Sequence, residues 1–148
     1  MILSTGGVAY VDCVQAEISS GASRYNLIQN GDFHTNTYWT ESAGRTAVSA
    51  SAAPQLDTTV YKMTGSPDTL QSVCQIIGVK GNAYDAYVLA GWAKGTSVPL
   101  NSGPRQFAMC LTFYNTDGTT TTTRIDFNAA YDAANDWQYT AGWSASKK

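Results

Sequence analysis

The sequence predicts an all-β fold, an antiparallel β-sandwich, on three observations. Nine Tyr and four Trp stand among 148 residues, and charged residues are only 14% of the chain, which suits half-buried pleated surfaces. Short apolar runs are separated by Gly, Asn, Asp and Pro at intervals typical of sandwiches. No stretch keeps a helical apolar period, so a parallel α/β architecture with phosphate-binding loops is not expected.

The expected strands follow one another, most of them closed by a turn signal. Residues 30–32 (Asn-Gly-Asp) and 115–118 (Asn-Thr-Asp-Gly) are the clearest turns. The run 107–114 is the strongest strand, and 120–127 is its expected hairpin partner. The expected strands cover residues 8–14, 25–28, 46–50, 60–63, 72–79, 84–94, 107–114, 120–127 and 137–145.

Alternation within these strands predicts which side chains form the core. One face of 107–114 is uniformly apolar, and one face of 120–127 is apolar or Thr. Both faces of 84–94 are apolar, so alternation alone leaves that strand ambiguous. The expected core faces are Phe107, Met109, Leu111 and Phe113 in one strand, and Thr123, Ile125 and Phe127 in the other.

Charge and cysteine content exclude several classes of protein. The net charge is −2 and no basic stripe exists, so a nucleic-acid partner is not expected. No apolar run is long enough to span a membrane. Cys13, Cys74 and Cys110 are widely spaced and odd in number, so we expect small buried hydrophobes rather than a disulfide framework. His34 is the only histidine, which argues against a zinc site.

The chain offers few catalytic candidates. No nucleophile signature surrounds His34. Asp126, Asp132 and Asp136 lie near one another in sequence, but the last two flank a loop, where solvated or capping roles are usual. We therefore expect a protein that is not an enzyme.

Three segments together resemble carbohydrate-binding modules of the family 4 and 9 type. Residues 26–33 (N-L-I-Q-N-G-D-F), followed by Trp39, resemble the opening of that family. Residues 87–95 (Y-V-L-A-G-W-A-K-G) resemble its central strand, and 136–142 (D-W-Q-Y-T-A-G) resemble a late strand. The likeness implies a galactose-binding-domain-like jelly roll.

Two further segments narrow the likeness. Residues 97–100 (S-V-P-L) and 113–119 (F-Y-N-T-D-G-T) resemble tandem modules of large clostridial-type surface proteins that also carry tyrosine-aspartate (Rhs-type) repeats. This resemblance implies an extracellular or cell-surface parent protein, with neighbouring modules of the same chain as partners.

Residues 8–17 (V-A-Y-V-D-C-V-Q-A-E) resemble the terminal strand of the same family, although here they precede the first strand. We therefore expect residues 1–18 to be the end of a preceding module, 19–24 a linker, and 25–148 the sandwich module. After Lys148 the family would continue with one more strand and the terminal strand. Residues 8–15 are therefore expected to fill the place of the missing closing strand, either within one chain or by a swap between chains.

The expected sugar site rests on aromatic side chains, because an aromatic ring can cover the C–H face of a pyranose while polar groups at the rim form hydrogen bonds. Trp39 and Trp137 stand at positions that the family uses for core packing. If the strand faces that carry the remaining aromatics converge on one sheet, they would line a shallow groove. The candidate carbohydrate-binding residues are Trp92, Tyr114 and Trp143, with Arg124 and Asp126 nearby.

The resemblance also implies a structural Ca²⁺ near the first and last strands, held by oxygen ligands. Asp12 matches the acid of the terminal strand, whereas His34 stands where the family has a second acid.

Two functions remain open from the sequence. The first is a non-catalytic carbohydrate-binding module that concentrates its parent protein on a polysaccharide. The second is a structural spacer or adhesion module in a tandem array that binds no sugar.

Overall fold

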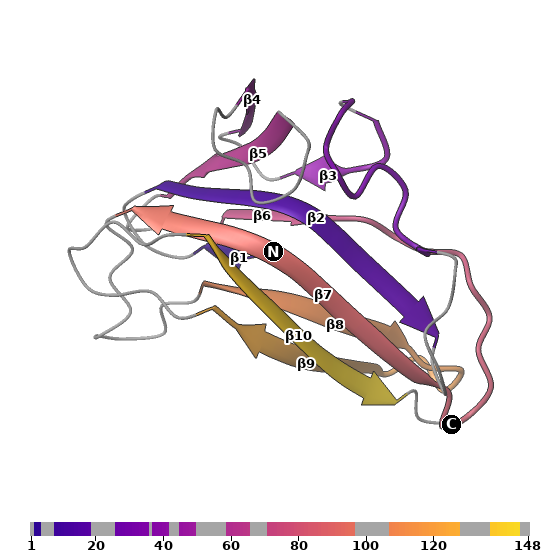
Figure 1. Cartoon of the computed structure of the whole chain (residues 1–148). Helices are drawn as coiled ribbons and strands as arrows, with labels where there is room; N and C mark the ends of the chain where they lie inside the picture. Colours follow the sequence, from indigo (N-terminus) through magenta and orange to yellow (C-terminus); the bar gives the residue numbers. More distant parts are fainter. Residues whose placement is uncertain are drawn as a thin grey trace.

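The structure, a computed structural model, is an all-β sandwich (Figure 1). It describes residues 2–3, 8–18, 26–35, 37–41, 45–49, 59–65, 71–96, 107–127 and 137–145. The expected linker at 19–24 and the acids Asp132 and Asp136 lie outside these ranges. The strands are β1 (Ile2–Leu3), β2 (Val8–Ile18), β3 (Thr40–Glu41), β4 (Arg45–Ser49), β5 (Thr59–Thr64), β6 (Gln71–Cys74), β7 (Ala86–Thr96), β8 (Phe107–Tyr114), β9 (Thr120–Asp126) and β10 (Gln138–Ala145).

The strands form two sheets that pack against each other. One, here called the β8 sheet, has the order β3-β6-β1-β8-β9, and the other, the β7 sheet, has the order β10-β7-β2-β5-β4. The described pairings are all antiparallel. The predicted antiparallel β-sandwich is therefore confirmed.

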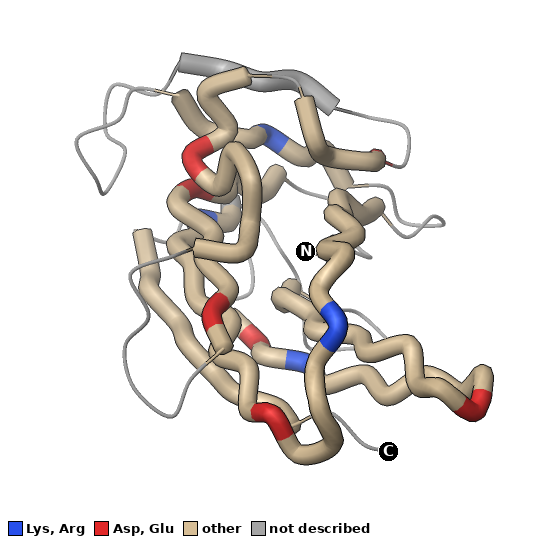
Figure 2. Tube along the Cα trace, turned by 90° about the vertical axis from the view of Figure 1, so that its right-hand side faces the viewer, with Lys and Arg blue, Asp and Glu red and all other residues tan. Residues whose placement is uncertain are grey.

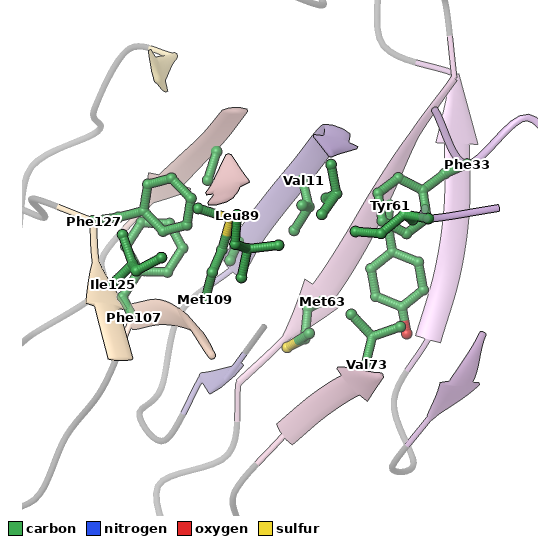
Figure 3. Close-up of a cluster of buried hydrophobic side chains, with 14 of the residues drawn as sticks. Val11, Phe33, Tyr61, Met63, Val73, Leu89, Phe107, Met109, Ile125 and Phe127 are labelled. Atoms are coloured by element: carbon green, nitrogen blue, oxygen red, sulfur yellow. The ribbon is translucent and has the colours of Figure 1, made fainter. Parts of the chain in front are cut away.

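Apolar side chains from both sheets meet in the space between them (Figure 3). Phe107 and Met109 of β8 and Ile125 of β9 are buried there, together with Val11 of β2 and Leu89 of β7. The rings of Phe107 and Phe127 lie 5.0 Å apart between centroids. The buried cluster comprises Ala9, Val11, Val14, Ala16, Ile28, Phe33, Tyr61, Met63, Val73, Leu89, Ala93, Phe107, Met109, Ile125 and Phe127.

The burial pattern confirms the predicted core face of β8 and decides the ambiguous face of β7. Leu111 packs against the cluster with part of its side chain, and the Phe113 ring lies 5.2 Å from that of Tyr87. In β7, Tyr87, Leu89 and Ala93 are buried. The even-numbered residues of β7 consequently face away from the other sheet.

The sandwich is tightest where the edge strands β9 and β10 approach each other. A Cβ added at Gly142 would stand 2.7 Å from Cγ1 of Ile125. The Thr123 hydroxyl donates a 2.7 Å hydrogen bond to the Ser144 hydroxyl across the two sheets. Because Gly142 has no side chain, the β10 backbone can lie close to Ile125 of β9, near this hydrogen bond.

Strand β2 lies in the middle of the β7 sheet, between β7 and β5. Its first residues pair with β5, and residues 8–12 and 15–18 pair with β7. The segment that resembles a terminal strand is therefore part of this sandwich, paired within its own chain. Whether residues 1–18 also mark the end of a preceding module stays a prediction.

Residues 26–33, which resemble the opening of the family, dock on a β-bulge in β2. The β2–β7 register shifts between Asp12 and Gln15, and Cys13 has a φ of 49°. Within this bulge, the Val14 N–H donates to the Gly31 carbonyl at 2.8 Å, and beyond it the Leu27 N–H donates to the Ala16 carbonyl at 2.8 Å.

Of the strand predicted at 25–28, the described residues 26–28 do not form a strand, because a side chain replaces the regular ladder there. Asn26 Oδ1 accepts hydrogen bonds from the N–H groups of Ala16 and Ile28, at 3.0 Å each. Its Nδ2 donates to the Val14 carbonyl at 3.1 Å. The segment is thus a turn-rich loop docked on β2 rather than a strand of either sheet.

Other boundaries also differ from expectation. The strand expected at 72–79 ends at Cys74, and the following residues pair with no strand among those the structure describes. The cysteines were expected to be buried, but Cys13 and Cys110 are only partly buried and Cys74 is exposed. Trp39 packs against the core with part of its side chain; its indole stacks on Phe33 at 4.9 Å between ring centroids.

Charged residues are scattered along the described trace without forming a stripe (Figure 2). Within the described ranges no helix is long and apolar enough to cross a membrane.

Candidate functional site

The outward side of the β7 sheet carries a row of aromatic side chains. In the register, Tyr139 of β10 lies opposite Trp92 of β7, and Trp143 lies opposite Val88. Since alternate residues share a face, Trp92, Tyr139 and Trp143 all lie on the side away from the core. These three residues are called the aromatic face.

Two of these side chains are open to solvent. Trp143 is 69% exposed and Tyr139 is 57% exposed. Trp92 is partly buried, and its ring lies 5.4 Å from that of Tyr139 between centroids, tilted by 53°. Trp92 thereby supports Tyr139 from the neighbouring strand. Tyr139 and Trp143 are four residues apart along one strand, a separation of roughly 13 Å.

Polar side chains border the aromatic face on β2. Gln15 lies opposite Ala90 and Glu17 lies opposite Val88, one strand beyond β7. The Gln15 side-chain amide donates a hydrogen bond to the Glu17 carboxylate. The arrangement is therefore apolar at the β10 edge, with amide and carboxylate groups beside it.

A second polar border crosses the sheet at one end of the aromatic face. Tyr10 of β2 lies between Lys62 of β5 and Lys94 of β7 in the register. All three are partly buried. An amine donor from each neighbour thus flanks a phenol, which adds donors and acceptors on the same side of the sheet.

The remaining predicted site residues lie on the other sheet. Tyr114 is 76% exposed at the end of β8. Arg124 and Asp126 of β9 lie opposite Cys110 and Ala108, on the side away from the core. Arg124 Nε and Asp126 Oδ1 form a 2.9 Å ion pair.

The condition for one shared groove is therefore not met. Trp92 and Trp143 lie on the outward side of the β7 sheet, whereas Tyr114, Arg124 and Asp126 lie on the outward side of the β8 sheet. The sequence prediction brought together residues that the core separates. It also omitted Tyr139. This residue lies four positions before Trp143 in the same strand, so the alternation of side chains along the strand could have placed the two on one face.

Asp12, the expected metal ligand, is fully buried at the start of the β2 bulge. Its Oδ1 accepts a 2.8 Å hydrogen bond from the N–H of Cys13. His34, at the position of the second expected acid, is exposed. Among the residues described, no group of three or more His, Cys, Asp or Glu side chains is placed to hold a metal ion.

Oxygens near the bulge take part in the hydrogen bonds that hold the loop on β2. A shallow hollow of about 400 Å³ there is lined by loop and β2 residues, including Asn26 and Asn30. Asn26 Oδ1 already accepts two backbone hydrogen bonds, and Asn30 Oδ1 accepts one from Thr35. The calcium ion stays a prediction of the resemblance.

Burial raises the pKa of the Cys110 thiol, and Asp126 adds to the increase, while nearby positive charges, including Arg124, oppose it. A raised pKa keeps the thiol protonated at neutral pH, and the thiol is not the nucleophilic form.

No protein-family model, curated protein or solved structure matches this chain.

Proposed function

We propose that the chain is a non-catalytic carbohydrate-binding module of a secreted or cell-surface protein, and that its aromatic face contacts the glycan. The observation that carries the proposal is the exposure of Trp143 and Tyr139 on one side of one sheet. Large exposed aromatic side chains leave apolar area in water, which a partner can cover. The C–H face of a pyranose is such a partner.

The surroundings of the aromatic face suit a sugar because its hydroxyl groups need hydrogen-bonding partners. Gln15 and Glu17 offer amide and carboxylate groups on the same side of the sheet. A flat apolar platform with a few polar groups beside it is the usual composition of a small-molecule site. The separation of about 13 Å between Tyr139 and Trp143 along β10 suits a chain of sugar units rather than a single one.

The test is binding of the whole chain to a panel of soluble polysaccharides, measured by affinity electrophoresis and then calorimetry. We expect Trp143→Ala and Tyr139→Ala each to weaken binding about 30-fold, because truncating a central aromatic contact typically costs about 2 kcal/mol. Tyr114→Ala is the matched control: it removes an exposed aromatic side chain from the opposite side of the sandwich and should leave the affinity unchanged.

Two results would overturn this proposal. If the unmodified chain binds no polysaccharide in the panel, the spacer or adhesion function is favoured instead. If Tyr114→Ala abolishes binding while Trp143→Ala does not, the glycan sits on the β8 sheet.

A further inference from the structure

Strand β10 forms one edge of the β7 sheet. It pairs with β7 on one side, and no strand that the structure describes pairs with its other side. In Figure 1 it runs alongside β7, next to the edge strand β9 of the other sheet. The unpaired side of an edge strand presents alternating N–H and carbonyl groups, which form a template for another strand.

The sequence of β10 lacks the usual protection against such pairing. Its eight residues, Q-Y-T-A-G-W-S-A, include no charged residue and no proline. The neighbouring edge strand β9 differs, since it carries the exposed ion pair of Arg124 and Asp126. Long, uncharged edge strands readily pair with other strands, and charged side chains are a common means of preventing it.

We propose that β10 pairs antiparallel with β10 of a second copy of this chain, about a two-fold axis that passes beside Ala141. The two β7 sheets would then form one continuous sheet. A two-fold pairing is self-complementary, so one strand supplies both halves of the interface. This interface goes beyond glycan binding and does not depend on it.

The side chains of β10 favour this register over its neighbours. With Ala141 opposite Ala141 of the second copy, each Tyr139 lies opposite Trp143 of the other copy, on the outward side. Exposed aromatic side chains then form two cross-strand pairs, which stabilise antiparallel sheets. A two-fold axis at Gly142 would instead place Trp143 opposite Ala141 and lose both pairs. An axis at Thr140 would place Tyr139 opposite Ala141.

The inward side of β10 accepts the same register. Thr140 of one copy lies opposite Gly142 of the other. Gly142 already lies close to the Ile125 side chain, and the side chain placed opposite it is a small one. The outward side would combine Tyr139 and Trp143 from both copies in one continuous platform. A dimer would therefore present an aromatic surface of the same length along the strands but twice as wide across them.

The first test is the mass of the chain in solution, measured by sedimentation equilibrium over a concentration series without glycan. We expect a reversible dimer. Ala141→Lys should make the chain monomeric, because the substitution would place two ammonium groups directly opposite each other. Thr122→Lys is the control: Thr122 is also exposed on an outward face, but on the β8 sheet, and the variant should still dimerise. Circular dichroism confirms that both variants are folded.

The second test concerns the register. Ala141→Cys is made together with Cys74→Ser, which removes the exposed native thiol. Directly opposed residues have Cα atoms about 4.5–5.5 Å apart, within the range that a disulfide spans. We expect mild oxidation to give a covalent dimer, whereas Thr122→Cys in the same background should not.

A chain that stays monomeric at every concentration would overturn the proposal, as would an Ala141→Lys variant that still dimerises. A dimer without the disulfide would overturn the register. None of these outcomes affects glycan binding by one copy, which the polysaccharide panel measures separately.

Discussion

Phe107→Ala should lower the free energy of unfolding by about 3–5 kcal/mol, the usual cost of truncating a buried Phe. Phe107 is completely buried, and its ring packs against Phe127 at 5.0 Å between centroids. The cavity would open in the core between the two sheets, beside the Phe127 ring. The hydrogen bond from the Phe127 N–H to the Phe107 carbonyl, at 2.8 Å, holds the two backbone segments beside it in place.

Urea unfolding monitored by tryptophan fluorescence measures this loss. Tyr114→Ala is the control in the same strand, because its side chain is 76% exposed, and it should change stability by less than about 0.5 kcal/mol. Equal effects of the two substitutions would show that the inward face of β8 is misassigned.

The architecture was predictable because its evidence is local. The alternation of 107–114 fixed the inward face of β8, and the turn at 115–118 fixed its hairpin partner β9. The structure confirms both. Period-two patterns report on one strand at a time and need no knowledge of distant contacts.

The loop at 26–33 was not predictable in the same way. Leu27 and Ile28 form a short apolar run that resembles a strand, and both do pack on the core. The feature that makes this segment a loop is the side chain of Asn26, which bonds the backbone of a strand ten or more residues away. Such a long-range side-chain contact leaves no periodic signal.

The candidate site was predictable only in part by face, and not by sheet. The alternation of 107–114 placed Tyr114 on the face away from the core, and its exposure agrees with this. Both faces of 84–94 are apolar, so alternation left the outward position of Trp92 open. Which sheet a strand joins depends on pairing between distant segments. In the structure β8 and β10 belong to different sheets, so Tyr114 lies across the core from Trp143. Only the pairing of β10 with β7 shows that Tyr139 lies beside Trp92.

Gly31→Ala should cost about 3 kcal/mol, near the upper end of the range for overpacking. A Cβ at this position would lie far inside contact distance of the Val14 carbonyl oxygen. That oxygen also accepts the hydrogen bond from Asn26 Nδ2. Since backbone atoms cannot move aside by changing rotamer, the loop has to leave the β2 bulge or the bulge has to deform.

Gly78→Ala is the matched control, because a Cβ there meets no atom within 4 Å. Urea unfolding of both variants measures the difference in stability, and amide hydrogen exchange locates it. In Gly31→Ala the Val14 amide should exchange faster, since its acceptor is the Gly31 carbonyl. Unchanged protection at Val14 would contradict the docking of the loop on β2. Ala93 lies where β2 and β7 pair ahead of the bulge. If protection is lost at Val14 but kept at Ala93, the loop stabilises the bulge itself, and the sheet that carries the aromatic face stays folded without the loop.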